Sequence, residues 1–410
     1  MVLRNYLKQF LRDMRAQKLR LFLTVFGIVW GTAAVTLLLA FGEGLHRRVM
    51  VSQKGLGDAI VIAWPARTSR PWEGLPRGRG INLTAEDIAM LRREVEEIDR
   101  ISEEYRRDEA RLVQGTKAVS AEVAAANVDF GDMRNLVPET GRYFNNRDLD
   151  ERRRVVFLGD QLKKDLFGSA EAVGRSLRID GVPFLVVGVM REKDQDSSYS
   201  SRDKDKATIP STTFAAIYGT REVENFVFQV KDASRVPQAK KKVLAVAAHK
   251  YRFDPADEEA IQMWDTTEGV KFLDTFFVTF RAFLGIVGAL TLVVGGIGVS
   301  NIMNVVVEER TKEIGIKMAL GAKRRYVLGQ FIFETLAITL AGGIAGFLVS
   351  WGICEVFPRL GDLETYVGTP VISLQVAAIT TAILGSIGLL AGYFPARTAA
   401  NLKPIEALRM

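Results

Sequence analysis

The sequence predicts an α-helical membrane protein with four transmembrane helices, arranged as one plus three, and a large mixed α/β extracytoplasmic domain between the first and second spans. The main observation is the set of long runs without charge, at 21–42, 282–307, 335–354 and 365–396. They contain 22, 26, 20 and 32 residues. A helix that crosses a bilayer needs about 20 mostly apolar residues, so each run is long enough.

The charges around these runs predict the orientation. Residues 1–20 and 308–325 carry six Lys and Arg each, and three more follow residue 396, whereas 355–370 carries one. Cytoplasmic flanks are rich in Lys and Arg, so both termini and the 308–325 loop are expected in the cytoplasm. Residues 43–272 hold 38 basic and 38 acidic side chains, so the net charge of +7 comes mainly from the cytoplasmic pieces. Basic charge here indicates topology and lipid headgroup contact, and nucleic-acid binding is not expected.

These signals divide the chain into nine consecutive segments. They are a cytoplasmic amphipathic N-terminal helix (1–20), the first span (21–42), the extracytoplasmic domain (43–272), the second span (273–307), a cytoplasmic helix (308–322), the third span (323–354), a short outer loop (355–370), the fourth span (371–396) and a cytoplasmic C-terminal tail (397–410). A cleaved signal peptide is the alternative for 21–42, but its apolar run exceeds the roughly 7–15 residues of a signal core.

Within the outer domain, short patterns predict alternating strands and helices. Strands are expected at 58–64, about 119–128, 224–230 and 260–264, helices at 83–98 and 234–249, and a strand, turn and helix in succession over 153–168. Thr84, with Asp87 three residues later, is a candidate cap for the first of these helices. Two β-rich runs joined at Asp180 and Gly181 predict a hairpin over 175–190. Residues 65–80 and 191–206 are predicted to be loops, the second polar and mobile.

Motifs for covalent chemistry are missing. The single Cys354 allows no intrachain disulfide, and two histidines exclude a site with three histidine ligands. "GIKMALGAK" at 315–323 has the wrong glycine spacing for a phosphate-binding loop, and Arg324 stands where Ser or Thr is needed. No catalytic, cofactor-binding or metal-binding residue is therefore predicted, and the chain is not expected to be an enzyme.

Small residues within the spans predict close helix packing. Three pairs of glycines have the G-x-x-x-G spacing that lets helices approach: Gly27 and Gly31, Gly342 and Gly346, and Gly388 and Gly392.

The stretch "EERTKEIGIKMALGAKRR" at 308–325 carries nine charges between two apolar runs. Glu308–Lys312 and Glu313–Lys317 have the favourable acid-first spacing on a helix, and Gly321 is placed to end it. Ile314, Met318 and Leu320 are expected to supply apolar contacts to a cytoplasmic partner, with Ile314 and Met318 as the main anchors. The alternative is a simple connector that its charges hold in the cytoplasm.

Three segments resemble one permease family. "NVVVEERTKEIGIKMALGAKRRYVLGQFIFE" (304–334) is similar to the signature of the macrolide-exporter (MacB-like) permeases, which are related to the FtsX and lipoprotein-release permeases. "GYFPARTAANLKPIEALR" (392–409) resembles the end of that family's chains, and 141–190 resembles its outer domain. The similarity extends over nearly the whole chain.

The resemblance implies a type VII ABC permease that acts as a dimer by mechanotransmission, in which ATP hydrolysis opens and closes the outer domains. An inserted β-rich lobe would occupy about 134–200 of that domain. Glu334 matches an acidic residue early in the family's third span. The helix that couples to the ATPase would consist of Glu308, Glu309, Arg310, Thr311, Lys312, Glu313, Ile314, Gly315, Ile316, Lys317, Met318, Ala319, Leu320 and Gly321.

The resemblance also implies partners and a location. The chain would lie in the bacterial inner membrane with a second permease, as a homodimer or a paralogous heterodimer. Some family members carry a fused ATPase before the first span. Only twenty residues precede it here, so a separate cytoplasmic ABC ATPase is expected to bind ATP and Mg. A periplasmic adaptor and an outer-membrane duct are further candidate partners for an exporter or efflux permease. The alternatives are a lipoprotein-releasing permease and an FtsX-like regulator of a cell-wall hydrolase.

Overall fold

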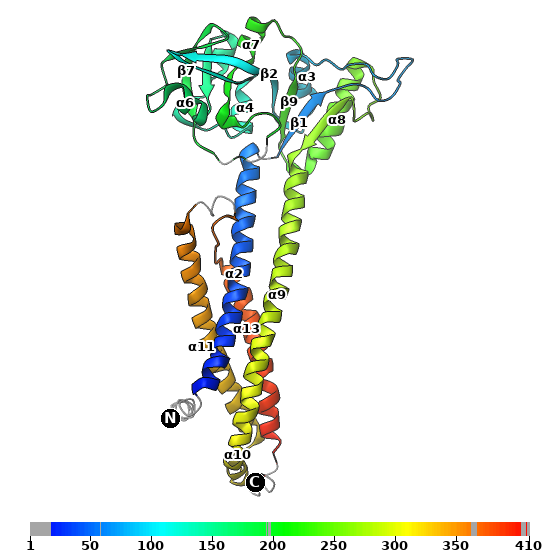
Figure 1. Ribbon diagram of the computed structural model, residues 1–410. Helices are drawn as coiled ribbons and strands as arrows, with labels where there is room; N and C mark the ends of the chain where they lie inside the picture. Colours follow the sequence, from blue (N-terminus) through cyan, green and yellow to red (C-terminus); the bar gives the residue numbers. More distant parts are fainter. Residues whose placement is uncertain are drawn as a thin grey trace. The chain divides into compact units, whose positions relative to one another are not determined.

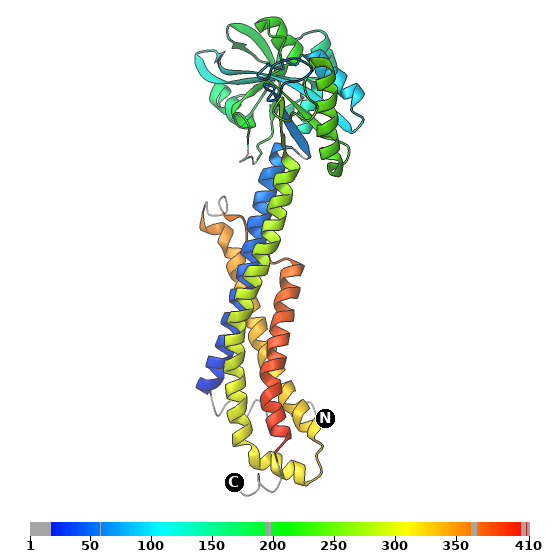
Figure 2. The same ribbon diagram turned by 90° about the vertical axis from the view of Figure 1, so that its right-hand side faces the viewer.

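The computed structural model describes residues 18–57, 59–193, 195, 198–361, 367–402 and 407. The chain divides into two compact units (Figures 1 and 2). We call Met1–Val49 with Asp274–Met410 the helical unit and Met50–Leu273 the α/β unit. The N-terminal helix predicted at 1–20 and most of the C-terminal tail lie outside the described residues.

Among the described residues, four helices are long and apolar enough to cross a membrane. They are α2 (Lys18–Leu56), α9 (Thr266–Glu309), α11 (Arg324–Val356), which continues into the short helix η3 (Phe357–Leu360), and α13 (Leu374–Ala400). The 44 residues of α9 would extend about 66 Å at 1.5 Å per residue, twice the bilayer's apolar core of about 30 Å. The last turns of α2 and the first turns of α9 accordingly belong to the α/β unit.

The six glycines with G-x-x-x-G spacing all lie against a neighbouring helix. In α11, a Cβ at Gly342 would contact Ile28 of α2, and one at Gly346 would lie 2.6 Å from the carbonyl oxygen of Val29. The other four glycines also face another helix: Gly27 lies near Gly295, Gly31 near Leu292, Gly388 near Thr339 and Gly392 near Thr335. Helix backbones therefore approach closely between α2 and α9, α2 and α11, and α11 and α13.

The α/β unit is built on one ten-stranded sheet. Along its main path the strand order is β10-β1-β9-β2-β3-β8-β5-β7-β4, with β6 paired to β2 and β7. The strands are β1 (Ile60–Pro65), β2 (Ile98–Gln114), β3 (Lys117–Ala126), β4 (Pro138–Gly141), β5 (Val155–Leu158), β6 (Ser176–Ile179), β7 (Val182–Met190), β8 (Ala207–Pro210), β9 (Asn225–Val230) and β10 (Ile261–Asp265).

Helices cover both faces of this sheet. They are α3 (Ala85–Glu94), α4 (Val128–Met133), α5 (Asn146–Asp150), α6 (Asp160–Phe167), α7 (Ser211–Tyr218), α8 (Val236–Tyr251) and the short helices η1 (Asp203–Asp205) and η2 (Ala233–Arg235). In β1, Val61 and Ala63 join one hydrophobic cluster, whereas Ile60 and Ile62 join another. Alternate side chains of a strand point to opposite faces, so β1 is buried on both sides of the sheet, in keeping with its nearly continuous apolar sequence.

Two local predictions in this unit are confirmed. Thr84 is the N-cap residue of α3, and the carboxylate of Asp87, three residues later, accepts a hydrogen bond from the backbone N–H of Thr84 at 2.8 Å. Strands β6 and β7 form the predicted hairpin, with Ile179 opposite Val182. The two turn residues, Asp180 and Gly181, have φ values of 46° and 85°, as a two-residue hairpin turn requires.

The prediction of a mobile polar loop at 191–206 is wrong for its second half. Asp203 and Lys206 are buried, and η1 lies within this segment. Their charges are neutralised by side chains from distant strands and helices, which the local polarity of the segment could not reveal.

Gly346 and Gly352 of α11 provide a matched test of helix packing. Gly346→Ala should destabilise the protein by about 1–3 kcal/mol, because the added methyl group meets the α2 backbone. Gly352→Ala should be neutral or stabilising by about 0.5–1 kcal/mol, because no atom lies within 4 Å of the new Cβ. Thermal unfolding of both variants in detergent would measure this. Equal unfolding temperatures would contradict the close α2–α11 packing.

Candidate functional site

Residues 308–325 form a helical corner between α9 and α11. Helix α9 ends at Glu309, Arg310 takes the cap position, and α10 follows as Thr311–Ala319. Gly321, with φ of 93°, then leads to α11 at Arg324. The continuous helix predicted from Glu308 is therefore wrong in its first turn, and Glu308 and Lys312 lie on different helices.

The inner face of α10 is fixed in the core of the helical unit. Ile314 is 4% exposed and belongs to a cluster with Val307 of α9, Phe331 of α11 and Ala399 of α13. Gly315 is also buried, and a Cβ there would lie 2.6 Å from the Cβ of Ala407. Helix α10 therefore packs against three long helices and cannot rotate without disturbing them.

An ion pair anchors the corner at its first residue. Nη1 of Arg310 lies 3.3 Å from both carboxylate oxygens of Glu334 in α11. Gln330, one turn earlier in α11, donates to the same carboxylate at 3.1 Å. The side chains of Arg310 and Glu334 are only 13% and 6% exposed. The acidic residue that the sequence placed within the third span is thus paired with the residue at which α9 turns into α10.

The outer face of α10 combines charge with exposed apolar surface. Ile316 and Leu320 are 49% and 84% exposed, and Lys312, Glu313 and Lys317 are also exposed. Ile316 and Leu320 are four residues apart and share one side of the corner with Lys312.

The predicted anchor Ile314 is therefore wrong, because it is buried, and Met318 is half-buried against the same core. Leu320, the third apolar contact predicted from the sequence, is exposed. Apolar residues stand at 314, 316, 318 and 320, a spacing that leaves the choice of face open in the sequence. We call Lys312, Glu313, Ile316, Lys317 and Leu320 the outer face of α10. It is suited to contact with another protein.

Comparison with known proteins assigns the family. The MacB-like periplasmic core domain matches residues 21–246, and the FtsX-like permease C-terminal domain matches residues 285–404. The chain belongs to the MacB-like ABC permease family. This confirms the resemblance seen in the sequence, and it makes the chain a membrane permease with a periplasmic core domain.

Two curated relatives align over almost the whole chain. One is the macrolide export ATP-binding/permease protein MacB of Wolinella succinogenes, 31% identical over 407 residues, which cover 98% of this chain and 60% of the relative. The other is the pyoverdine export ATP-binding/permease protein PvdT of Pseudomonas aeruginosa, 33% identical over 404 residues, with coverage of 97% and 57%. The chain thus spans about three fifths of the length of these relatives.

A solved structure, the periplasmic region of MacB from Actinobacillus actinomycetemcomitans, shares 16% identity and a TM-score of 0.43. The alignment covers 54% of this chain and 95% of the chain in that structure.

Methionine substitutions test the ion pair at the corner. Glu334→Met should destabilise the protein by about 3 kcal/mol, because Arg310 loses a buried carboxylate partner. Arg310→Met should have a similar effect. The double variant should be more stable than either single variant, since two apolar side chains of similar size leave no buried charge. Thermal unfolding of the three variants in detergent would measure the coupling, and strictly additive losses would contradict it.

Proposed function

We propose that this chain is the permease subunit of a MacB-type ABC exporter in the bacterial inner membrane. It couples ATP hydrolysis by a separate cytoplasmic ATPase to movements of its extracytoplasmic α/β unit, and these movements drive export. Family membership supports this proposal, as do the names of the relatives, which describe export of a macrolide and of pyoverdine. The names of these relatives do not favour the alternatives of lipoprotein release or regulation of a cell-wall hydrolase.

The ATPase is proposed to be a partner because these 410 residues lack a phosphate-binding loop. ATP and Mg would be held by that partner. A second permease, the same chain or a paralogue, would complete the transporter, as the family implies. A periplasmic adaptor and an outer-membrane duct would carry the substrate onward in an envelope with two membranes.

The coupling proposal rests on one observation: α10 has one face buried in the helical unit and one face exposed. Its inner face is locked to α9, α11 and α13 through Ile314, Gly315 and the Arg310–Glu334 ion pair. Its outer face presents Ile316 and Leu320 among charges. A force applied to the outer face would therefore reach three long helices at once, instead of being absorbed by a flexible loop.

The outer face supplies the test of ATPase docking. Desolvated apolar anchors dominate most interfaces, so Ile316→Asp and Leu320→Asp should each weaken ATPase association by about 2 kcal/mol, roughly 30-fold. Lys312→Ala should change it by less than about 1 kcal/mol, as is typical of exposed charges. The measurement is co-purification of the cognate ATPase with each variant at matched permease levels.

Because Ile316 and Leu320 point away from the core, both variants should keep the unfolding temperature of the parent protein. Wild-type ATPase binding by both variants would show that the corner is only a connector.

The proposed topology has one span followed by three, with both termini and α10 in the cytoplasm. Exposed cysteines in a Cys354→Ala background can test it. Glu171→Cys in the α/β unit should react with a membrane-impermeant maleimide on spheroplasts, whereas Lys312→Cys should react only after lysis. The motivation is the excess of Lys and Arg at 308–325. Labelling of Lys312→Cys before lysis would reverse the assigned orientation.

A further inference from the structure

The last turn of α2 lies within the α/β unit and is held there. Leu56 is 1% exposed and packs with Ile60, Phe130 and Met133. The connection from α2 to β1 is short and has unusual backbone angles, with φ of 136° at Gly57 and 51° at Ala59. Such a connection does not continue the helix into the strand, so the orientation of α2 must be set by contacts around its end.

One side chain joins that helix end to the rest of the α/β unit. Nζ of Lys193 donates to the carbonyl oxygens of Gly55 at 3.0 Å and Arg134 at 2.7 Å, and it pairs with the Asp203 carboxylate at 2.6 Å. An ammonium group has three N–H donors, so these three contacts use all of them. The last carbonyls of a helix have no partner within it, and a cation is favourable at that end.

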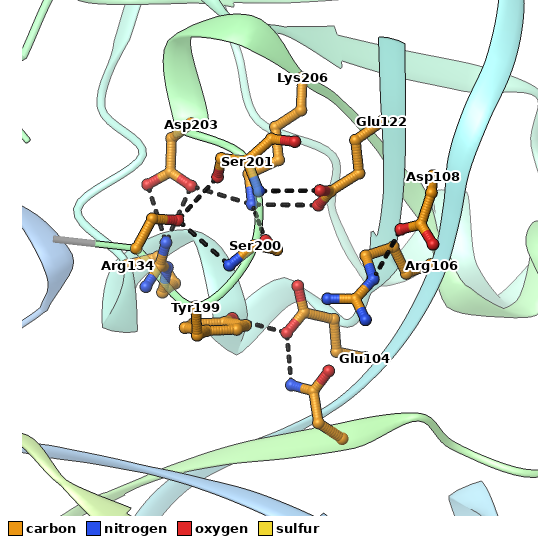
Figure 3. A network of polar contacts seen from close by, with 12 residues as sticks. Glu104, Arg106, Asp108, Glu122, Arg134, Tyr199, Ser200, Ser201, Asp203 and Lys206 are labelled. Atoms are coloured by element: carbon orange, nitrogen blue, oxygen red, sulfur yellow. Dashed lines mark hydrogen bonds and ion pairs between the residues drawn. The ribbon is translucent and has the colours of Figure 1, made fainter.

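Asp203 connects Lys193 to a buried group of charges. Figure 3 shows the members of this group around Asp203, among them Arg134, Lys206 and Glu122. Arg134, which is fully buried, donates from Nη2 to both oxygens of Asp203 at 2.9 and 3.1 Å. Lys206 lies 3.3 Å from the same carboxylate and 3.4 Å from Glu122 of β3. Burial alone would raise the pKa of Asp203, but Arg134, Lys206 and Lys193 outweigh it and hold that pKa below its usual range.

An aromatic ring links these charges to the central strands. The Arg134 guanidinium lies 4.9 Å from the ring centre of Tyr199. The Tyr199 hydroxyl donates to Glu104 of β2 at 2.6 Å, and the Asn225 side chain of β9 donates to the same carboxylate at 2.6 Å. We call Arg134, Asp203, Lys206, Glu122, Tyr199, Glu104 and Asn225 the buried polar network. Through Asp203 it connects Lys193 to β2, β3 and β9.

Removal of the Lys193 ammonium group would leave backbone carbonyls, and not a buried carboxylate, without their cation. Asp203 would still be paired with Arg134 and Lys206, so no carboxylate would be stranded. The carbonyls of Gly55 and Arg134 would lose the ammonium group that joins them. Loss of Lys193 should therefore weaken the attachment of α2 more than it weakens the fold of the α/β unit.

We propose that Lys193 is a positioning residue that clamps the C-terminal turn of α2 to the buried polar network, so that movement of α2 is passed to the central strands of the α/β unit. This inference rests on the proposed function for its role in transport, but the clamp itself can be tested without it. Nothing in the polar sequence around Lys193 distinguishes it from its charged neighbours.

The clamp is tested with spin labels in the full-length protein. Labels at Val51→Cys, on the exposed side of the last turns of α2, and at Glu171→Cys report the distance distribution within the α/β unit, in a Cys354→Ala background. Lys193→Met should broaden the distribution, whereas Lys193→Arg should restore a narrow one. The matched control is Lys231→Met, since Lys231 also donates to a carbonyl, that of Glu96 at 3.0 Å, but is exposed.

If the distance distribution between the two labels is the same in Lys193→Met as in the parent protein, the proposed clamp is wrong. If that variant does not accumulate as a folded protein, Lys193→Gln takes its place, and the same two outcomes decide.

The role in transport is tested in the complex with the cognate ATPase subunit. Nucleotide should change hydrogen exchange in residues 198–206 of the wild type and of Lys231→Met, and Lys193→Met should lose this change. A wild-type complex without any nucleotide effect would contradict the proposed function, while the spin-label distances would still decide the clamp. A nucleotide effect that persists in Lys193→Met would show that α2 does not act through this residue.

Discussion

The pairing of Arg310 with Glu334 determines how the helical unit is assembled at one end. A carboxylate enclosed by apolar helices is very unfavourable unless a cation or hydrogen-bond donors lie beside it. Glu334 obtains both from Arg310 and Gln330. Because Arg310 is the residue at which α9 stops and α10 begins, satisfying the carboxylate also fixes the direction in which the chain turns. The corner, the inner face of α10 and the start of α11 all follow from that requirement.

The same requirement explains why α10 presents two different surfaces. With Arg310 held by α11, Ile314 one turn later is directed into the cluster formed by α9, α11 and α13. Ile316 and Leu320 are then left outside, although apolar side chains of this size would normally be buried. Exposed apolar side chains next to charged ones are typical of interaction surfaces. Because Ile314 is buried, Ile316 is placed on the opposite, exposed side of α10.

Features specified by adjacent residues were predictable from the sequence. The apolar runs, the Asp180–Gly181 turn and the Thr84–Asp87 cap depend on residues within a few positions of one another. Strand β2 was not predicted, because it is rich in charged residues and a bulge between Arg107 and Ala110 interrupts its alternation. The burial of Asp203 was hidden as well, since its partner Arg134 lies 69 positions away. Which face of α10 is exposed could not be predicted either, because it depends on which side the long helices cover.

The two long helices that enter the α/β unit are attached to it in different ways. Helix α9 follows β10 without a break, from Asp265 to Thr266, and the Thr266 hydroxyl donates to the carbonyl of Ile60 in β1 at 2.8 Å. Its displacement would pull directly on an edge strand of the sheet.

Helix α2 is instead separated from β1 by a bend and depends on Lys193 and on the packing of Leu56. Ammonium–carbonyl contacts tolerate changes in angle that a continuous backbone does not, because the donor sits at the end of a flexible side chain. Helix α9 is thus attached by a continuous backbone, whereas α2 is attached by a bent connection together with the Lys193 clamp and the packing of Leu56. A displacement of α2 would therefore reach the central strands through Lys193 and the buried polar network, whereas a displacement of α9 would reach the edge strand β10 directly.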